Sequence, residues 1–135
     1  MSLQTTMAEI TDALLPLTSV IPDLQVSGYW NDNPSPPAVD VYPGIPFQDG
    51  AAFGVGNNRA YFTVRARVGM ADPQASQQLL LRMLDPQDPA SIEGALANAD
   101  AVVEPDGVSG FTQYADDAPA NERMLGCEWR VSKFL

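Results

Sequence analysis

Carboxylate pairs are the side chains of this 135-residue chain best suited to chemistry. Asp85 and Asp88 form one pair, and Asp116 and Asp117 form another. Two carboxylates can act as acid and base on a glycosidic bond, but only when they face each other across a cleft. Both pairs lie among prolines and turn-forming residues, where Asp is common because it accepts hydrogen bonds from nearby backbone amides. We therefore interpret them as turn residues.

Other catalytic motifs are missing from the sequence. The chain contains no His, which excludes Ser-His-Asp and Cys-His catalysis and histidine-ligated metals. The segment Gly54-Val55-Gly56 is too short for a phosphate-binding loop, and Ser109 does not stand in a complete Gly-x-Ser-x-Gly elbow. The single cysteine, Cys127, can form neither an internal disulfide nor a zinc cluster. We therefore expect no catalytic, metal or cofactor site, and no enzyme.

The total charge excludes further classes. Seven Lys and Arg against 17 Asp and Glu give a net charge of −10, which is unsuited to coating DNA or RNA. No apolar stretch approaches the ~18 residues of a membrane-spanning helix. No basic residue precedes Arg59, so the N-terminus lacks the positive region of a signal peptide. We expect a soluble protein that is made and used without export.

The placement of the charges is uneven. Residues 1–58 and 83–122 contain no Lys or Arg, so every basic residue lies in one of two segments. These residues are Arg59, Arg65, Arg67 and Arg82 in the first segment, and Arg123, Arg130 and Lys133 in the second. One interpretation is an acidic surface that serves solubility alone. The alternative is a subunit with one basic and one acidic face, which could pack head-to-tail on copies of itself.

Apolar periodicity predicts the elements that position these residues. The strand at 59–68 is the clearest, because its apolar residues alternate with polar ones that include three arginines. We expect helices over 3–15, 72–84 and 91–98, strands over 24–29, 38–42 and 59–68, and a hairpin with arms 108–114 and 125–131. Cys127 and Trp129 should face the core. The sequence predicts one α+β domain over 1–135, with two to three helices on one face of a mainly antiparallel sheet.

Residues 43–58 are the least regular segment, and we expect them to form a long loop. The segment contains several glycines, yet it also carries Phe47 and Phe53. Such apolar side chains could fold back onto the chain's own core. They could instead order against a neighbouring subunit, since binding residues are often carried by loops.

The order of these segments resembles a known family over nearly the whole chain. The matching segments are Val26-Ser27-Gly28-Tyr29, Pro36-Pro37-Ala38-Val39, Val68-Gly69 before a helix starting near Asp72, and Ser91-Ile92-Glu93-Gly94-Ala95-Leu96 before the last hairpin. This layout is similar to that of the small tail-terminator and tail-completion proteins of long-tailed, siphovirus-type bacteriophages, especially those of actinobacterial hosts. The similarity is one of pattern and spacing.

The resemblance implies a structural virion protein without catalytic residues. Such subunits form a ring, typically a hexamer, that caps the tail tube, ends its polymerisation and joins the tail to the neck and head. The implied partners are further copies, the tail tube protein and a neck or head-completion protein, with no membrane. DNA would pass through the lumen without specific binding. The implied location is the tail and neck of the virion, after assembly in the host cytoplasm.

Six residues are candidates for the subunit or partner interface. Phe47 and Phe53 are candidate anchors, because aromatic residues dominate interface hot spots. The candidates for ion pairs between subunits are Arg59, Arg65 and Arg67, together with Arg130. The alternative for these arginines is a solvated strand face, where exposed ion pairs contribute only ~0–1 kcal/mol.

Other functions remain open from the sequence. Within the virion, the chain could be a head–tail stopper or adaptor, or a minor tail protein. In a different class, it could be an acidic inhibitor that mimics nucleic acid, as the net charge of −10 allows. Mimicry needs carboxylates spaced along a surface like phosphates, and many of these carboxylates lie in predicted turns.

Overall fold

The computed structural model describes residues 3–48, 59–115, 117–119 and 122–134. Over these residues three α-helices and six strands follow one another. They are α1 (Leu3–Leu14), β1 (Gln25–Ser27), β2 (Ala38–Gln48), β3 (Arg59–Gly69), α2 (Pro73–Leu84), α3 (Ile92–Leu96), β4 (Val102–Val108), β5 (Thr112–Tyr114) and β6 (Met124–Phe134). Short 3₁₀ segments follow α1 at Leu15–Ser19 and α3 at Ala97–Ala99.

The strands form one sheet in the order β1-β2-β3-β6-β4, and β5 also pairs with β6. β1 and β2 run parallel, and every other pair is antiparallel. β6 follows every other described strand in the sequence, yet it lies between β3 and β4. The predicted α+β class with a mainly antiparallel sheet is confirmed.

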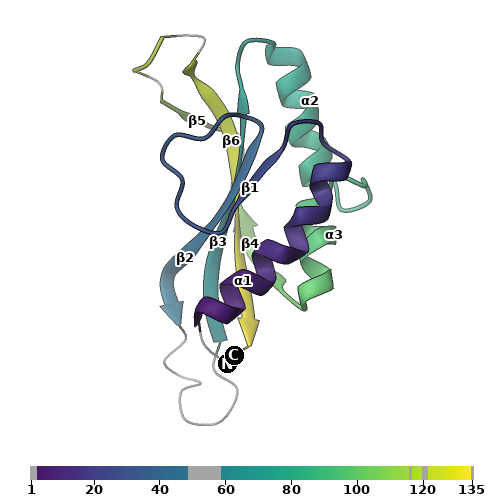
Figure 1. The fold of residues 1–135 in the computed structure, drawn as a ribbon, viewed down its shortest axis with the longest axis vertical. Coiled ribbons are helices and arrows are strands. Elements are labelled where there is room, and N and C mark those ends of the chain that lie inside the picture. The colour runs from purple at the N-terminus through teal and green to yellow at the C-terminus, as the bar shows by residue number, and fades with distance from the viewer. Residues whose placement is uncertain (1–2, 49–58, 116, 120–121, 135) are drawn as a thin grey trace.

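All three helices lie on one face of this sheet (Figure 1). The core forms where they meet it, because apolar residues alternate along the strands and recur along the helices. Each helix contributes fully buried side chains, among them Ile10, Leu80 and Ile92. Trp129 of β6, which is 1% exposed, packs in the same core, as the sequence predicts.

The helix starts follow the local signals in the sequence. The Asp72 side chain accepts a hydrogen bond from the backbone N–H of Ala75 at 3.2 Å, directly before Pro73. The Ser91 side chain caps α3 in the same way, through the N–H of Gly94 at 2.9 Å. The first α-helix ends at Leu14, one residue before its predicted end and shortly ahead of Pro16. The chain continues as a 3₁₀ segment, which accepts Pro16 in its first turn.

Three strands, β2, β4 and β5, differ most from the prediction. β2 runs to Gln48, so residues 43–48 are strand rather than loop, and residues 49–58 lie outside the described part of the chain. β4 was not predicted, because Pro105, Asp106 and Gly107 interrupt its alternation. The pairing of β4 with β6 shifts register between Val103 and Val108, which accommodates this interruption as a bulge. Only Thr112–Tyr114 of the predicted 108–114 arm pairs as β5.

Cys127 should be unreactive in the folded protein. The side chain is 0% exposed, and burial raises the pKa of its thiol to about 11. The reactive thiolate is therefore scarce at neutral pH, and reagent access requires the core to open. We expect labelling by a thiol reagent at pH 8 to be at least 100-fold slower in the native protein than in urea. Labelling at similar rates in both states would contradict the assigned burial.

A candidate interaction surface

The face of the sheet opposite the helices, here called the open face, carries most of the arginines. Residues directly opposite one another in paired strands share a face, so the strand register identifies its members. Asp40 of β2 pairs with Arg65 of β3, which pairs with Glu128 of β6. Thr63 pairs with Arg130, and Arg59 pairs with Phe134. Charged and aromatic side chains therefore lie side by side across the three central strands.

Asp40 and Arg65 form a bidentate ion pair at the centre of the open face. The Nε of Arg65 donates to Oδ1 of Asp40 at 3.1 Å, and its Nη2 donates to Oδ2 at 2.6 Å. The two side chains are only 1% and 6% exposed. Arg67 also approaches the carboxylate, with Nη2 at 3.4 Å from Oδ2. A buried carboxylate shared by two arginines holds β2 and β3 in one register.

Asn31, in the segment between β1 and β2, closes over this ion pair. Its backbone N–H donates to Oδ2 of Asp40 at 3.1 Å. Its carbonyl oxygen accepts from Nη2 of Arg67 at 2.6 Å and from Nη2 of Arg65 at 3.4 Å. We call Asn31, Asp40, Arg65 and Arg67 the buried arginine cluster. Its two guanidinium groups and one carboxylate contact one another and are almost completely buried, and this leaves little of them for a partner.

Three aromatic rings surround Arg65. The Cζ atom of its guanidinium lies 4.8 Å from the ring centre of Trp30, 5.1 Å from that of Tyr42 and 5.6 Å from that of Tyr114. Trp30 and Tyr42 also contact each other, with centroids 4.5 Å apart. The Tyr114 hydroxyl donates to the carboxylate of Glu128. Cation–π contacts of this kind stabilise the desolvated guanidinium further.

A second group of residues lies where β6 ends and remains partly exposed. We call it the exposed arginine patch, and its members are Arg59, Tyr61, Val102, Glu104, Arg130 and Phe134. Arg59 contacts Glu104 at 3.5 Å and lies 5.3 Å from the ring centre of Phe134. Arg130 stacks at 4.5 Å on Tyr61. Val102 is 59% exposed and Phe134 is 57% exposed, so apolar surface borders the arginines.

The six predicted interface residues fall into three groups. Arg65 and Arg67 belong to the buried arginine cluster, so a solvated strand face does not describe them, and the carboxylate they contact is Asp40 of the same chain. Arg59 and Arg130 lie together in the exposed arginine patch. Phe47 lies on β2, and its side chain is outside the described part of the structure. Phe53 lies outside the described residues altogether.

Sequence reasoning missed the partners that bury two of these arginines. Asp40 interrupts the apolar run Val39–Val41, and a charge at that position was a signal for a buried ion pair. Only the register between β2 and β3 shows that it faces Arg65. Asn31 contributes its backbone N–H and carbonyl groups, and because every residue has a backbone carbonyl, its residue type could not have indicated this role. Tyr114 and Glu128 meet because β5 pairs with β6.

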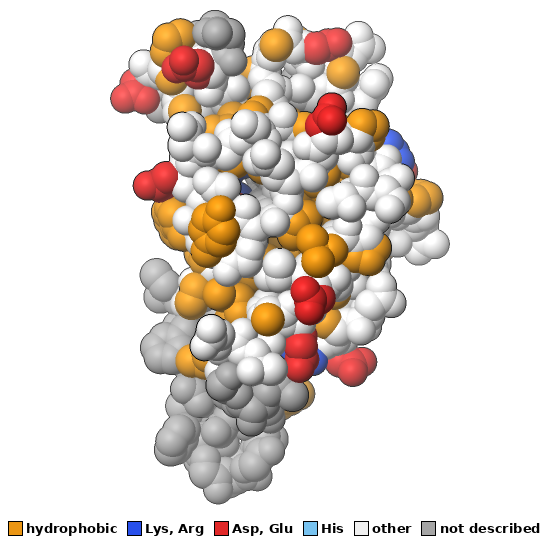
Figure 2. All heavy atoms as spheres, in the orientation of Figure 1, with side chains coloured by type: hydrophobic (Ala, Val, Ile, Leu, Met, Phe, Trp, Pro, Cys, Tyr) orange, Lys and Arg blue, Asp and Glu red, His pale blue; other side chains and the backbone are white. Residues whose placement is uncertain are grey.

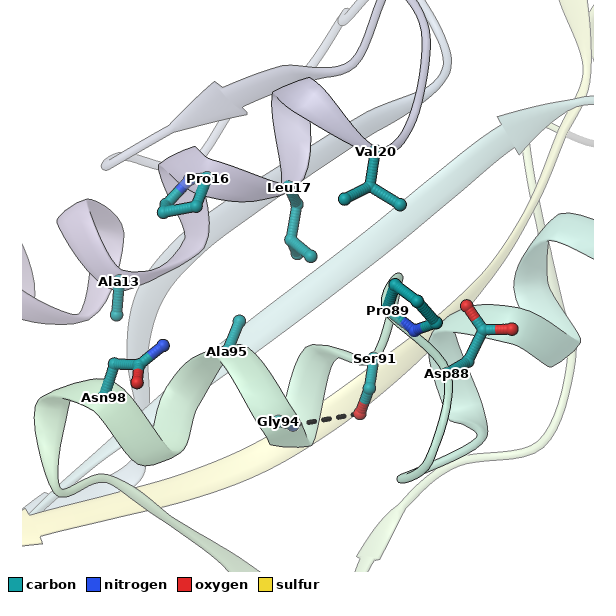
Figure 3. Close-up of a pocket in the computed structure, with 10 residues that line it drawn as sticks. All are labelled: Ala13, Pro16, Leu17, Val20, Asp88, Pro89, Ser91, Gly94, Ala95 and Asn98. Carbon is teal, nitrogen blue, oxygen red and sulfur yellow. Dashed lines mark hydrogen bonds between the residues drawn. The ribbon is translucent and has the colours of Figure 1, made fainter.

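A hollow of about 290 Å³ lies on the helical side, between α1 and its 3₁₀ extension and α3 (Figure 3). Two of its polar side chains, Ser91 and Asp88, already serve the fold. Ser91 caps α3, and Asp88 accepts from the Ala90 N–H at 2.8 Å and contacts Arg82 at 3.2 Å. The Ala90 hydrogen bond, followed by Arg82, lowers the pKa of Asp88. We assign no ligand to this hollow.

The carboxylate pairs do not form a metal site among the described residues. Asp85 accepts a hydrogen bond from the backbone N–H of Gln87 at 2.9 Å, as a turn residue does. Together with the contacts of Asp88, this confirms the interpretation of that pair as turn residues. Asp116 lies outside the described residues, so the second pair stays an interpretation.

The tyrosines of the open face should make stability depend on alkaline pH. Burial raises the pKa of Tyr114, as does its hydrogen bond to Glu128, and burial together with Glu128 raises that of Tyr42. Their contribution is therefore present below the unfolded pKa of about 10 and is lost as pH rises through the folded values. We expect the free energy of unfolding to fall from pH 10 upward, and more gently in Tyr114→Phe.

Denaturant titrations at pH 8, 10 and 11 measure this effect. Tyr29→Phe is the matched control, because Tyr29 is 61% exposed and should leave the pH profile unchanged. Identical profiles for the wild type and Tyr114→Phe would show that the Tyr114 hydroxyl does not contribute to the alkaline loss.

No protein-family model matches the chain, and a search of curated proteins finds no significant match. Among the described residues, no helix is both long and apolar enough to cross a membrane. The class that the structure itself defines is a single-sheet α+β domain with helices on one face and a charged aromatic surface on the other.

Proposed function

We propose that the protein is the subunit of a ring that caps a phage tail tube, ends its polymerisation and joins the tail to the neck. The segment order supports this proposal through its resemblance to tail-terminator proteins. The observation that carries it furthest is the open face. An α+β domain with helices on only one side of its sheet leaves the other side, apart from the part that the segment of Asn31 covers, for contacts with further chains.

The chemistry of the described residues suits a role in assembly. The exposed arginine patch combines exposed apolar side chains with arginines, a composition typical of protein interfaces. The chain as a whole carries a net charge of −10, which disfavours adhesion of DNA moving through a lumen. Shape and charge would therefore perform the function, with no covalent chemistry.

The nucleic-acid-mimic alternative is less well supported. Several carboxylates are engaged within the chain: Asp40 is buried with Arg65, Asp72 caps α2, and Asp88 contacts Arg82. These groups are not available as a row of phosphate substitutes. Binding to a basic DNA-binding enzyme that is lost in moderate salt would nevertheless favour this alternative over a ring.

Electron microscopy of the purified protein tests the proposal directly. We expect rings in solution, or rings at the ends of tail tubes once tubes are added. A protein that stays monomeric and never binds tube would overturn the proposal.

Deletion of the gene from the phage that encodes it tests the role in assembly. We expect tails of uncontrolled length and heads without tails, both corrected by supplying the protein in trans. Tails of normal length that fail to join heads would favour the stopper or adaptor alternative. Normal joined particles would rule out both roles.

A further inference from the structure

We infer that the exposed arginine patch docks on the acidic end of the helical face of a second copy of this chain. The inference rests on the proposed ring and goes further by naming the two surfaces that meet. A contact between two different surfaces of identical subunits is heterologous, and such contacts generate rings when the rotation between neighbours closes.

The exposed arginine patch has unsatisfied capacity to bind. Arg130 has no carboxylate partner among the described residues, although its guanidinium is held in place over Tyr61 at 4.5 Å. The Nε atoms of Arg59, Arg67 and Arg130 are buried and have no hydrogen-bond partner in the described part of the chain, so only the outer atoms of Arg59 and Arg130 could meet a partner. Exposed Phe134 and Val102 flank these groups. A partner surface that supplies carboxylates would pair with Arg130, and apolar contact would cover Phe134 and Val102.

The matching surface lies on the helices. Glu9 and Asp12 of α1 and Asp100, which follows α3, line one hollow together with Lys133 and the apolar residues Ala13 and Pro16. We call Glu9, Asp12 and Asp100 the acidic patch. Figure 2 shows carboxylates gathered on the lower part of the helical face. Lys133 contacts Glu9 at 3.5 Å and leaves the surface net negative.

The two patches lie on opposite faces of the subunit at the same end. Successive residues of a strand point to opposite faces. At the end of β6, Lys133 reaches the acidic patch, and Phe134 belongs to the exposed arginine patch. The start of α1 lies at this end as well (Figure 1). Docking one patch on the other therefore places the next subunit beside the first with little displacement along the long axis, and a rotation between neighbours would close such a row into a ring.

The charges of the two surfaces complement each other. Two arginines and one carboxylate make the exposed arginine patch net positive, and three carboxylates with one lysine make the opposing surface net negative. A chain with a net charge of −10 would otherwise repel its own copies. Arg65 and Arg67 take no part in this contact, because Asp40 and Asn31 already occupy them.

A charge exchange between two variants tests the inference. The first variant is Arg130→Glu, and the second is Glu9→Lys with Asp12→Lys. Each alone brings like charges together and should weaken self-association at least tenfold, as measured by sedimentation. In an equimolar mixture each contact again joins opposite charges, so assemblies that alternate the two variants should form. Arg82→Glu makes the same charge change on α2, away from both patches, and should assemble like the wild type.

The mixture separates a broken interface from a broken fold, since only folded subunits can restore assembly. If the wild type assembles and either variant alone assembles equally well, the inference is wrong, while the proposed ring is unaffected. Variants that stay apart in the mixture, although circular dichroism shows both to be folded, would also overturn it. A wild-type protein that remains monomeric with and without tail tubes would overturn both proposals.

Discussion

Replacing Asp40 with alanine should lower the free energy of unfolding by about 3–5 kcal/mol, the usual effect of removing one partner from a buried ion pair. The carboxylate accepts two hydrogen bonds from Arg65 and one from the backbone of Asn31. Its removal leaves Arg65 and Arg67 buried without a counter-charge, at 5% and 3% exposed. Burial already lowers the pKa of Arg67 in the presence of Asp40, which indicates how costly its charge is there.

Urea titration of the wild type and the variant measures this loss. Glu122→Ala is the control, because it removes an exposed carboxylate outside both proposed contact surfaces and should change stability by no more than about 0.5 kcal/mol. Arg65→Lys adds a second comparison, since it keeps the charge but cannot form the bidentate pair. A loss below 1 kcal/mol for Asp40→Ala would mean that the cluster is hydrated in solution.

Replacing Gly126 with alanine should cost about 3 kcal/mol, at the upper end of the range for overpacked sites. Gly126 lies opposite Arg67 in the β3–β6 pairing. A Cβ atom at this position would collide with the carbonyl oxygen of Ala66, and it would lie 2.8 Å from a ring carbon of Tyr114 and 3.1 Å from Cγ of Arg67. The carbonyl belongs to the neighbouring strand, so it cannot move away without disturbing the sheet.

Gly110→Ala is the matched control, because a Cβ atom there would have nothing within 4 Å. We expect the control to leave the thermal midpoint within a few degrees of the wild type. Gly126→Ala should lower it by roughly 10 °C or more, given the size of the domain. Equal midpoints for the two variants would show that the strands around Gly126 separate easily.

Local signals in the sequence were sufficient to predict most of the fold. The alternation along 59–68, the Asp72-Pro73 start of α2 and the Ser91 cap of α3 each depend on neighbouring residues, and each was read correctly. The β4 strand was missed because its Pro and Gly residues are typical of a turn. It is held in place by pairing with β6, which lies far along the chain.

The candidate site could be predicted only in part, because it also depends on contacts between residues far apart in the sequence. The sequence showed three arginines on one side of a strand, but it could not show which of them would be buried. That depends on Asp40 and Asn31, which lie 25 and 36 residues from the arginines they contact most closely. Arg59 and Arg130 remain accessible because no comparable segment of the described chain covers that end of the sheet.

The position of β6 between β3 and β4 has a consequence for synthesis of the protein. A nascent chain that has left the ribosome only as far as β5 lacks a central strand of its own sheet, so one full edge of β3 is unpaired. Such edges pair readily with other chains. Where many such chains are present together, this edge would favour their association, and chaperones that shield strand edges would then limit the yield of folded protein.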